Sequence, residues 1–147
     1  MASGKDNNNS IGFLSMIYQA VQTADMVGIF RNDAAPLTNL YVSLHTANPG
    51  AGGAQNTSEA AYSGYARQAV VRTSAGWTLT GETITNAAAI TFPAASSGPE
   101  TETYVGIGTL VSGAGVLLWF GQLTAPLVVN NGISPNIAIG QLSVTES

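Results

Sequence analysis

The chain has 147 residues, of which 45% are hydrophobic and only 8% are charged, and its formal net charge is −4. This length suits one domain that buries most of its surface, whereas the charged fraction lies far below the roughly one quarter of ordinary soluble domains. No Lys or Arg follows Arg72, so the C-terminal half lacks the clustered cations that nucleic-acid phosphates require, and the absence of cysteine excludes disulfides and thiolate chemistry.

The N-terminal region combines a polar segment with an amphipathic one. Residues 1–9 are rich in asparagine, and we expect a flexible or partner-ordered arm. Apolar residues spaced i, i+3 and i+4 then predict a helix over residues 11–27, too interrupted by polar residues for a signal peptide or membrane span. We therefore divide the chain into an arm and helix (residues 1–35) and a β domain (residues 36–147). The predicted assembly contacts on the helix are Phe13, Leu14, Ile17 and Val21.

After Pro36 the hydrophobic pattern changes to a period of two, which is typical of half-buried strands. Turn residues such as those of Asn48-Pro49-Gly50 separate the apolar runs. Eight or nine short strands, at intervals of about ten residues, indicate a sandwich or barrel. The predicted fold is mainly β, an antiparallel β-sandwich of jelly-roll type that follows the arm and amphipathic helix. The predicted strands are residues 40–45, 65–73, 77–80, 83–86, 89–92, 102–109, 116–123, 127–129 and 137–145.

The run GIGTLVSGAG, residues 106–115, contains two G-x-G pairs after an apolar segment, as phosphate-binding loops do. The dinucleotide fingerprint needs a glycine where Val111 stands, and the phosphate loop needs a lysine that is absent here. Both motifs also require a following helix, but VLLWFGQL is typical of a strand. We therefore predict a β-hairpin, in which Gly106 and Gly108 mark the close approach of another backbone or a bulky side chain.

The residue types that carry chemistry are scarce. His45, the only histidine, shares a strand face with Ser43, but we expect the Ser43 side chain to point alongside the ring rather than toward it. We therefore expect His45 to be a surface or hydrogen-bonded structural residue, and one histidine without cysteine makes no zinc site. The close pair Glu100 and Glu102 is predicted to be a solvated edge that discourages strand pairing. The sequence thus predicts no catalytic residue, no metal site and no cofactor.

The aromatic residues lie mostly on predicted strands. We expect Trp77, Phe92 and Phe120 to pack in the core. The alternative is an exposed platform that binds glycans, for which Tyr62, Tyr65 or Trp119 could serve.

Three stretches carry a family resemblance: LYVSLHTANPGAGGAQNTSEAAYSGYARQAVVRTSAGW, NAAAITFPAA, and YVGIGTLVSGAGVLLWFGQLTAPLVVNNGISPNIAIGQLSVTE. Together they resemble a family of small structural proteins of tailed bacteriophages. Its members are often labelled tail fibre protein, and in some virions they are similar to capsid cement or decoration proteins. The resemblance spans residues 40–146, and its most specific pieces are L-x-V-S-L-H-T-A-N-P-G, G-Y-A-R, G-I-G-T and N-G-I-S-P. It implies a β-rich virion component that acts by assembly and has no catalytic residues.

Three hypotheses follow, and an enzyme is less favoured than any of them. The first is a capsid cement or decoration protein that assembles as a homotrimer and binds the major capsid protein on the outer capsid surface. The second is a tail or fibre component, and the third is a carbohydrate-binding module for host-surface glycans. The depletion of charge suits the centres of large interfaces. We expect assembly in the host cytoplasm, with no nucleic-acid or membrane partner.

Overall fold

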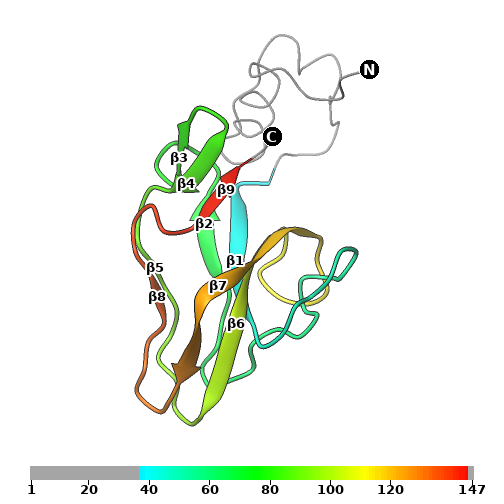
Figure 1. The fold of residues 1–147 in the computed structure, drawn as a ribbon, viewed down its shortest axis with the longest axis vertical. Coiled ribbons are helices and arrows are strands. Elements are labelled where there is room, and N and C mark those ends of the chain that lie inside the picture. The colour runs from blue at the N-terminus through cyan, green and yellow to red at the C-terminus, as the bar shows by residue number, and fades with distance from the viewer. Residues whose placement is uncertain (1–36, 146–147) are drawn as a thin grey trace. The chain divides into compact units, whose positions relative to one another are not determined.

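A computed structural model describes residues 37–145 of the protein, and these residues form nine strands (Figure 1). The pairings of β1 with β6, β6 with β7, β3 with β4, β4 with β9 and β5 with β8 are all antiparallel. The prediction of a mainly β, antiparallel protein is therefore confirmed. The strands are β1 (Asn39–His45), β2 (Gln68–Val71), β3 (Trp77–Thr80), β4 (Thr83–Asn86), β5 (Ile90–Thr91), β6 (Glu100–Gly108), β7 (Leu117–Val129), β8 (Asn136–Ile137) and β9 (Ser143–Thr145).

Some of the predictions reach beyond this structure. The predicted helix over residues 11–27 lies outside the described residues, and so do the assembly contacts Phe13, Leu14, Ile17 and Val21. The strands form three sheets of four, three and two strands. The jelly-roll arrangement and the boundary near residue 35 remain predictions.

The strands belong to two compact units. The large unit comprises Asn39–Val70 and Ile90–Ile137, and contains the sheet with the order β2-β1-β6-β7 and the β5–β8 pair. The small unit contains Val71–Ala89 and the segment from Ala138 onward, with the sheet β3-β4-β9. Each unit has buried apolar side chains of its own.

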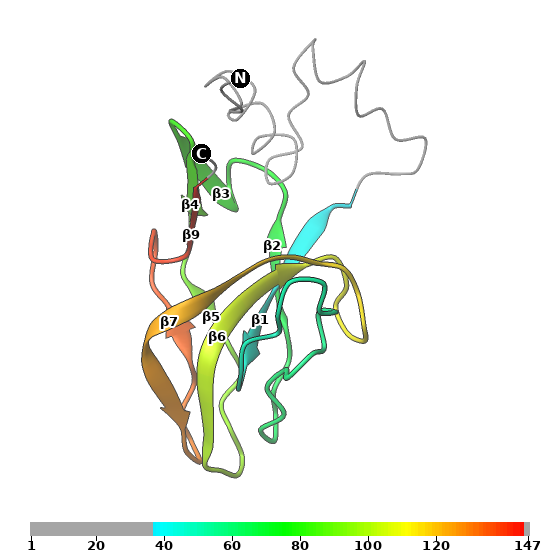
Figure 2. The same cartoon turned by 45° about the vertical axis from the view of Figure 1, so that its right-hand side comes forward.

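The four-stranded sheet of the large unit has two different faces. On one face, Val42 and Leu44 of β1 lie beside Ile107 and Val105 of β6, and all four side chains are buried. This alternation follows from the two-residue period of a strand, which sends successive side chains to opposite faces. The other face of the same strands carries the polar and glycine residues, and it is covered by the chain that follows β1. Figures 1 and 2 show this segment, in teal to green, beside the yellow tip of the β6–β7 hairpin.

The hairpin predicted from the glycine run is confirmed, because β6 and β7 pair antiparallel on either side of it. The two predicted strands 116–123 and 127–129 are, however, one continuous strand, β7. Between the pairs Glu102–Leu127 and Tyr104–Gln122 the register shifts, so that four residues of β7 bulge opposite one residue of β6. Pro126 fits in this strand because β7 is an edge strand, where a missing N–H interrupts no ladder.

In the small unit, Asn86 explains why the predicted strand 137–145 is divided. The Asn86 side chain donates to the carbonyl oxygen of Ala138 at 2.9 Å and accepts from the Leu142 N–H at 2.9 Å. Gly140, whose N–H donates to the Asn86 carbonyl, has a φ of +74°, a left-handed conformation that a strand cannot contain. The chain therefore turns between β8 and β9.

Candidate functional site

Six polar side chains cover the glycine face of the large unit's sheet, and we call them the polar cluster: Ser43, His45, Gln55, Glu59, Tyr65 and Arg67. The two glycines of β6 make room for them. A Cβ on Gly106 would lie 2.6 Å from His45 Nε2 and 2.8 Å from Ser43 Oγ, and a Cβ on Gly108 would collide with the Gln55 side chain. The prediction that these glycines mark a close approach is confirmed.

Ser43 and His45 form a hydrogen-bonded pair at the base of this cluster. His45 Nδ1 lies 2.9 Å from the carbonyl oxygen of Thr57, so that nitrogen carries the proton, and Nε2 accepts from Ser43 Oγ at 2.9 Å. The expectation that Ser43 would point alongside the ring is therefore wrong, because the pleat and the missing Cβ of Gly106 let the hydroxyl reach Nε2. Burial lowers the pKa of His45, which favours the neutral ring.

This arrangement resembles a serine–histidine dyad in its hydrogen bonds, but it has no access for a substrate. Ser43 and His45 both have 0% exposure. A nucleophile must reach a substrate carbonyl, and neither side chain is exposed to solvent. The geometry supports the prediction of a hydrogen-bonded structural histidine.

Arg67 and Glu59 form a nearly buried ion pair with two hydrogen bonds. Arg67 Nε donates to Glu59 Oε1 at 2.6 Å and Arg67 Nη2 donates to Glu59 Oε2 at 2.7 Å. The exposed fractions of the two side chains are 2% and 15%. Tyr65 adds a third donor to the same carboxylate, at 3.0 Å, and burial followed by the charge of Glu59 raises the pKa of this phenol.

The same arginine also holds the loop between β6 and β7, residues 109–116, which we call the hairpin tip. Arg67 Nη1 donates to the Leu110 carbonyl at 2.8 Å, and Nη2 donates to the Gly113 carbonyl at 2.6 Å. Gln55 secures the tip from the other side, because its Oε1 accepts the Leu110 N–H at 3.1 Å and its own N–H donates to the Ala114 carbonyl at 2.7 Å. The tip is thus fixed by two side chains that are themselves buried.

The tip presents three large apolar side chains to solvent. Val111 and Val116 are each 61% exposed and Leu110 is 48% exposed. Along β7 the exposed face continues with Phe120, at 38% exposure, so the prediction that Phe120 packs in the core is wrong. On β7, Phe120 lies opposite Gly106 of β6. The polar cluster covers Gly106 but leaves Phe120 exposed. Trp77 and Phe92, by contrast, are buried as predicted.

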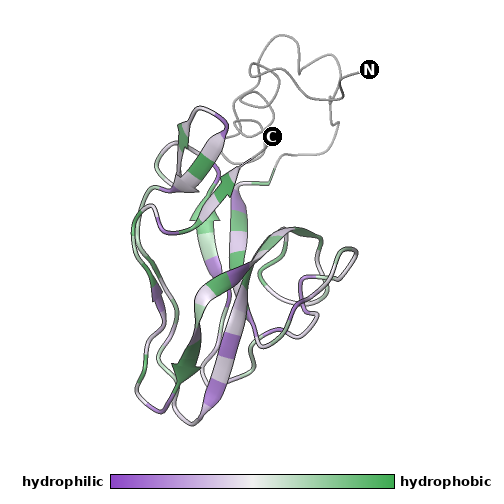
Figure 3. Cartoon of the chain, in the orientation of Figure 1, coloured by the Kyte–Doolittle hydropathy of each residue, from purple (hydrophilic) through white to green (hydrophobic). Residues whose placement is uncertain are grey.

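The acidic pair at the start of β6 is not a solvated edge. Glu102 is 0% exposed, and no N–H or O–H of the described residues donates to either of its carboxyl oxygens. Burial, then the charge of Glu100, raises the pKa of Glu102 to about 8. This shift favours the protonated form of the buried Glu102 carboxyl. The neighbouring Glu100 accepts the Ala61 N–H at 2.8 Å. Figure 3 shows the purple start of β6 beside the green end of β7.

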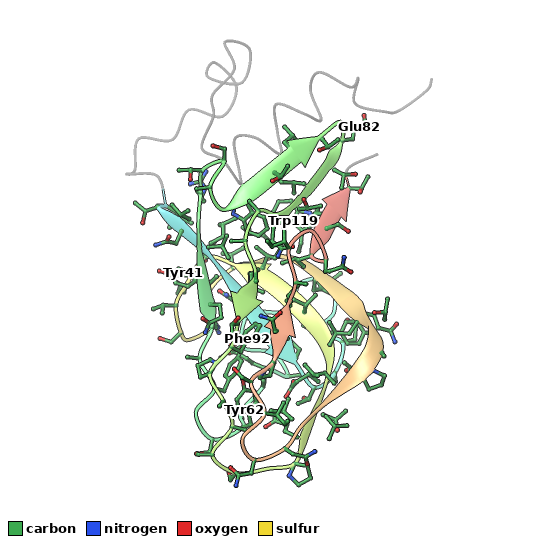
Figure 4. The ribbon with its side chains drawn as sticks, turned by 90° about the vertical axis from the view of Figure 1, so that its left-hand side faces the viewer. Tyr41, Tyr62, Glu82, Phe92 and Trp119 are labelled. Atoms are coloured by element: carbon green, nitrogen blue, oxygen red, sulfur yellow. The ribbon has the colours of Figure 1, made fainter. Side chains whose placement is uncertain are left out.

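The aromatic residues of the alternative interpretation, a glycan-binding platform, are largely buried. Tyr62 is 5% exposed and donates its hydroxyl to the Pro93 carbonyl at 3.1 Å. The Tyr65 ring lies 5.3 Å from Tyr62 and 6.2 Å from Phe92, so the three rings pack against one another. Figure 4 shows Tyr62 and Phe92 in the same region of the large unit. Trp119 is half-buried.

Within residues 37–145, no three histidine or acidic side chains lie close enough together to hold a metal ion. The same residues include no helix with the length and hydrophobicity needed to cross a bilayer.

Comparison with known families identifies the family of this chain. Residues 5–145 match the family model described as "Podophage GP4 fiber I protein gp80". The chain belongs to this family. It is therefore a bacteriophage structural protein, related to fibre proteins. The sequence resemblance also implied a structural component of the virion. A comparison with curated proteins finds no match.

Three of the four sequence pieces that carry the resemblance meet in the polar cluster. The piece L-x-V-S-L-H contributes the dyad, G-Y-A-R contributes Tyr65 and Arg67, and G-I-G-T contributes the two glycines beneath them. Sequence reasoning missed the roles of Gln55 and Arg67. The sequence signal that could have indicated Arg67 is the rarity of charge. Where only 8% of the residues are charged, a basic residue is a candidate for an ion pair with an acidic one.

Proposed function

We propose that this protein is a structural subunit of a podophage tail fibre that acts by assembly and catalyses no reaction. The observation that carries the proposal is the use of the polar cluster. The side chains that could act as acids, bases or nucleophiles form hydrogen bonds to one another or to backbone carbonyls beneath the surface. They are Ser43, His45, Glu59 and Arg67. The hairpin tip that they support exposes side chains suited to contact with protein.

The family match supports a fibre rather than a capsid location, because the family's description names a fibre protein. The partners are then other copies of this chain and neighbouring fibre or tail proteins, instead of the major capsid protein. In the capsid cement hypothesis, the exposed apolar tip would also contact other proteins, but the protein would lie on the capsid instead of in the fibre.

The test is to separate heads from tails of purified virions and to measure this protein in each fraction by mass spectrometry. We expect it in the tail fraction, and gold-labelled antibodies against the chain should decorate the fibres in electron micrographs. Recovery with the heads alone would refute the fibre proposal and support a capsid cement protein.

A further inference from the structure

The second half of the chain contains a long segment without charge. No Asp, Glu, Lys or Arg occurs between Glu102 and Glu146. This segment includes the hairpin tip and all of β7, so the exposed side chains of Val111, Val116, Phe120 and Val128 have no charged neighbour in the sequence around them. We call the exposed side chains of residues 110–128 the uncharged surface.

β7 is an unusual edge strand. It has 13 residues, whereas strands typically have about 5–6. Among the described strands it is bonded to β6 on one side and has no strand on the other. Proteins normally protect such edges with charges, prolines or short strands. The opposite edge of the sheet, β2, follows that rule with four residues and Arg72 directly after it. β7 has Pro126 and the bulge that contains it, but no charged residue.

The hairpin tip beside this edge is already ordered. Arg67 donates to two of its carbonyls, Gln55 accepts the Leu110 N–H, and the Thr109 N–H donates to the Val116 carbonyl at 3.1 Å. An interface formed from fixed groups loses less conformational entropy on binding than one formed from a mobile loop. By fixing the tip, the ion pair of Arg67 and Glu59 lowers the entropy that the tip would lose on binding a partner.

The absence of charge also indicates which partner fits. At a symmetry axis each side chain meets the same side chain of another copy, so an ionised residue there would meet its own charge. Each copy has a net charge of −4, and all eight acidic residues lie outside the uncharged surface. We infer that the uncharged surface lies on the symmetry axis of a homo-oligomer, where the tip and β7 contact a second copy of this chain. This inference rests on the proposed function as an assembling fibre subunit.

The absence of native cysteine gives a direct test, because a single introduced thiol can form a disulfide only between copies. A disulfide requires the two Cα atoms to lie within about 7 Å of each other. Only identical residues near the symmetry axis meet this condition. The full-length variants Val116→Cys and Phe120→Cys are oxidised with oxidised glutathione, which accepts the two electrons. The control is Thr80→Cys, an exposed strand position in the small unit. We expect a covalent dimer in non-reducing gels for at least one of the first two variants and none for the control.

A second measurement uses charge instead of a crosslink. In sedimentation velocity the wild-type chain should be oligomeric at micromolar concentration. Phe120→Glu, which is exposed and should still fold, should weaken association at least tenfold, whereas Thr80→Glu should not. Circular dichroism checks that both variants are folded.

The outcomes separate this inference from the proposed function. A wild-type monomer at all accessible concentrations, or an oligomer that resists Phe120→Glu and yields no crosslink, would overturn the symmetry-axis inference. If the protein were then found in the tail fraction of virions, the fibre proposal would stand and β7 would be assigned to a different protein partner. An oligomer with both expected results but recovered only with heads would refute the fibre location and leave the inference intact.

Discussion

The replacement of Arg67 by methionine is the most informative perturbation of this structure, because one guanidinium holds both Glu59 and the hairpin tip. The substitution keeps the apolar stem and removes the donors to Glu59, Leu110 and Gly113. Glu59 then loses both charge-assisted bonds from its cation, and two carbonyls lose their donor. Removal of one partner from a buried pair costs about 3–5 kcal/mol.

We expect the lower half of that range, about 3 kcal/mol, because Glu59 keeps the Tyr65 hydroxyl and is partly exposed. Urea unfolding of the wild type and Arg67→Met measures the difference. The double variant Glu59→Leu with Arg67→Met also removes the carboxylate that Arg67→Met leaves without its cation. It should recover at least about 1 kcal/mol of the lost free energy of unfolding. Hydrogen exchange at the Leu110 and Val116 amides should accelerate in both variants.

Two results would refute this reasoning. If Arg67→Met costs less than about 1 kcal/mol, the ion pair does not hold the tip. If the double variant is less stable than the single one, the cost does not come from an uncompensated charge at Glu59. Because the pair is shielded from solvent, the loss should also change little between low and high salt.

Two further predictions concern β6. Glu102→Gln should reduce the dependence of stability on pH. Burial raises the folded pKa of Glu102 to about 8, above its unfolded value, so the folded state retains a proton that the unfolded state releases, and wild-type stability falls as the pH rises from about 4 to about 8. Urea unfolding at pH 5 and pH 8 measures this, and an equal pH dependence in wild type and variant would contradict it. Gly106→Ala should destabilise the protein by about 1–3 kcal/mol, because its Cβ would overlap Ser43 and His45, whereas Gly121→Ala, with no atom within 4 Å of the added Cβ, should leave stability unchanged or slightly raised. Thermal unfolding compares the two, and equal effects would show that the close approach at Gly106 is not tight.

Local patterns in the sequence predicted much of the fold. β3 and β4 have the predicted bounds, because each is a short run of strand-forming residues on either side of a turn at Gly81. The glycine run was correctly interpreted as a hairpin, since the missing lysine and the strand-like residues after it exclude a phosphate loop on local grounds. Period-two alternation likewise placed Val42 and Leu44 in the core.

Predictions failed where the outcome depends on which strand lies beside which. The hydrophobic pattern of β6 and β7 does not reveal which strands lie beside them. Pairing left Phe120 exposed on the edge strand and buried Glu102, which lies opposite Leu127. The dyad depends on the absence of a Cβ across the sheet at Gly106, 61 residues beyond His45.

The sequence by itself therefore determined the β character, the turns and the scarcity of reactive groups, because these depend on neighbouring residues and composition. Only the tertiary structure decided that Arg67 supports an exposed apolar tip and that β7 remains an open edge among the described strands. The physical reason is that burial and pairing are set by contacts between residues far apart in the chain, which no local pattern contains.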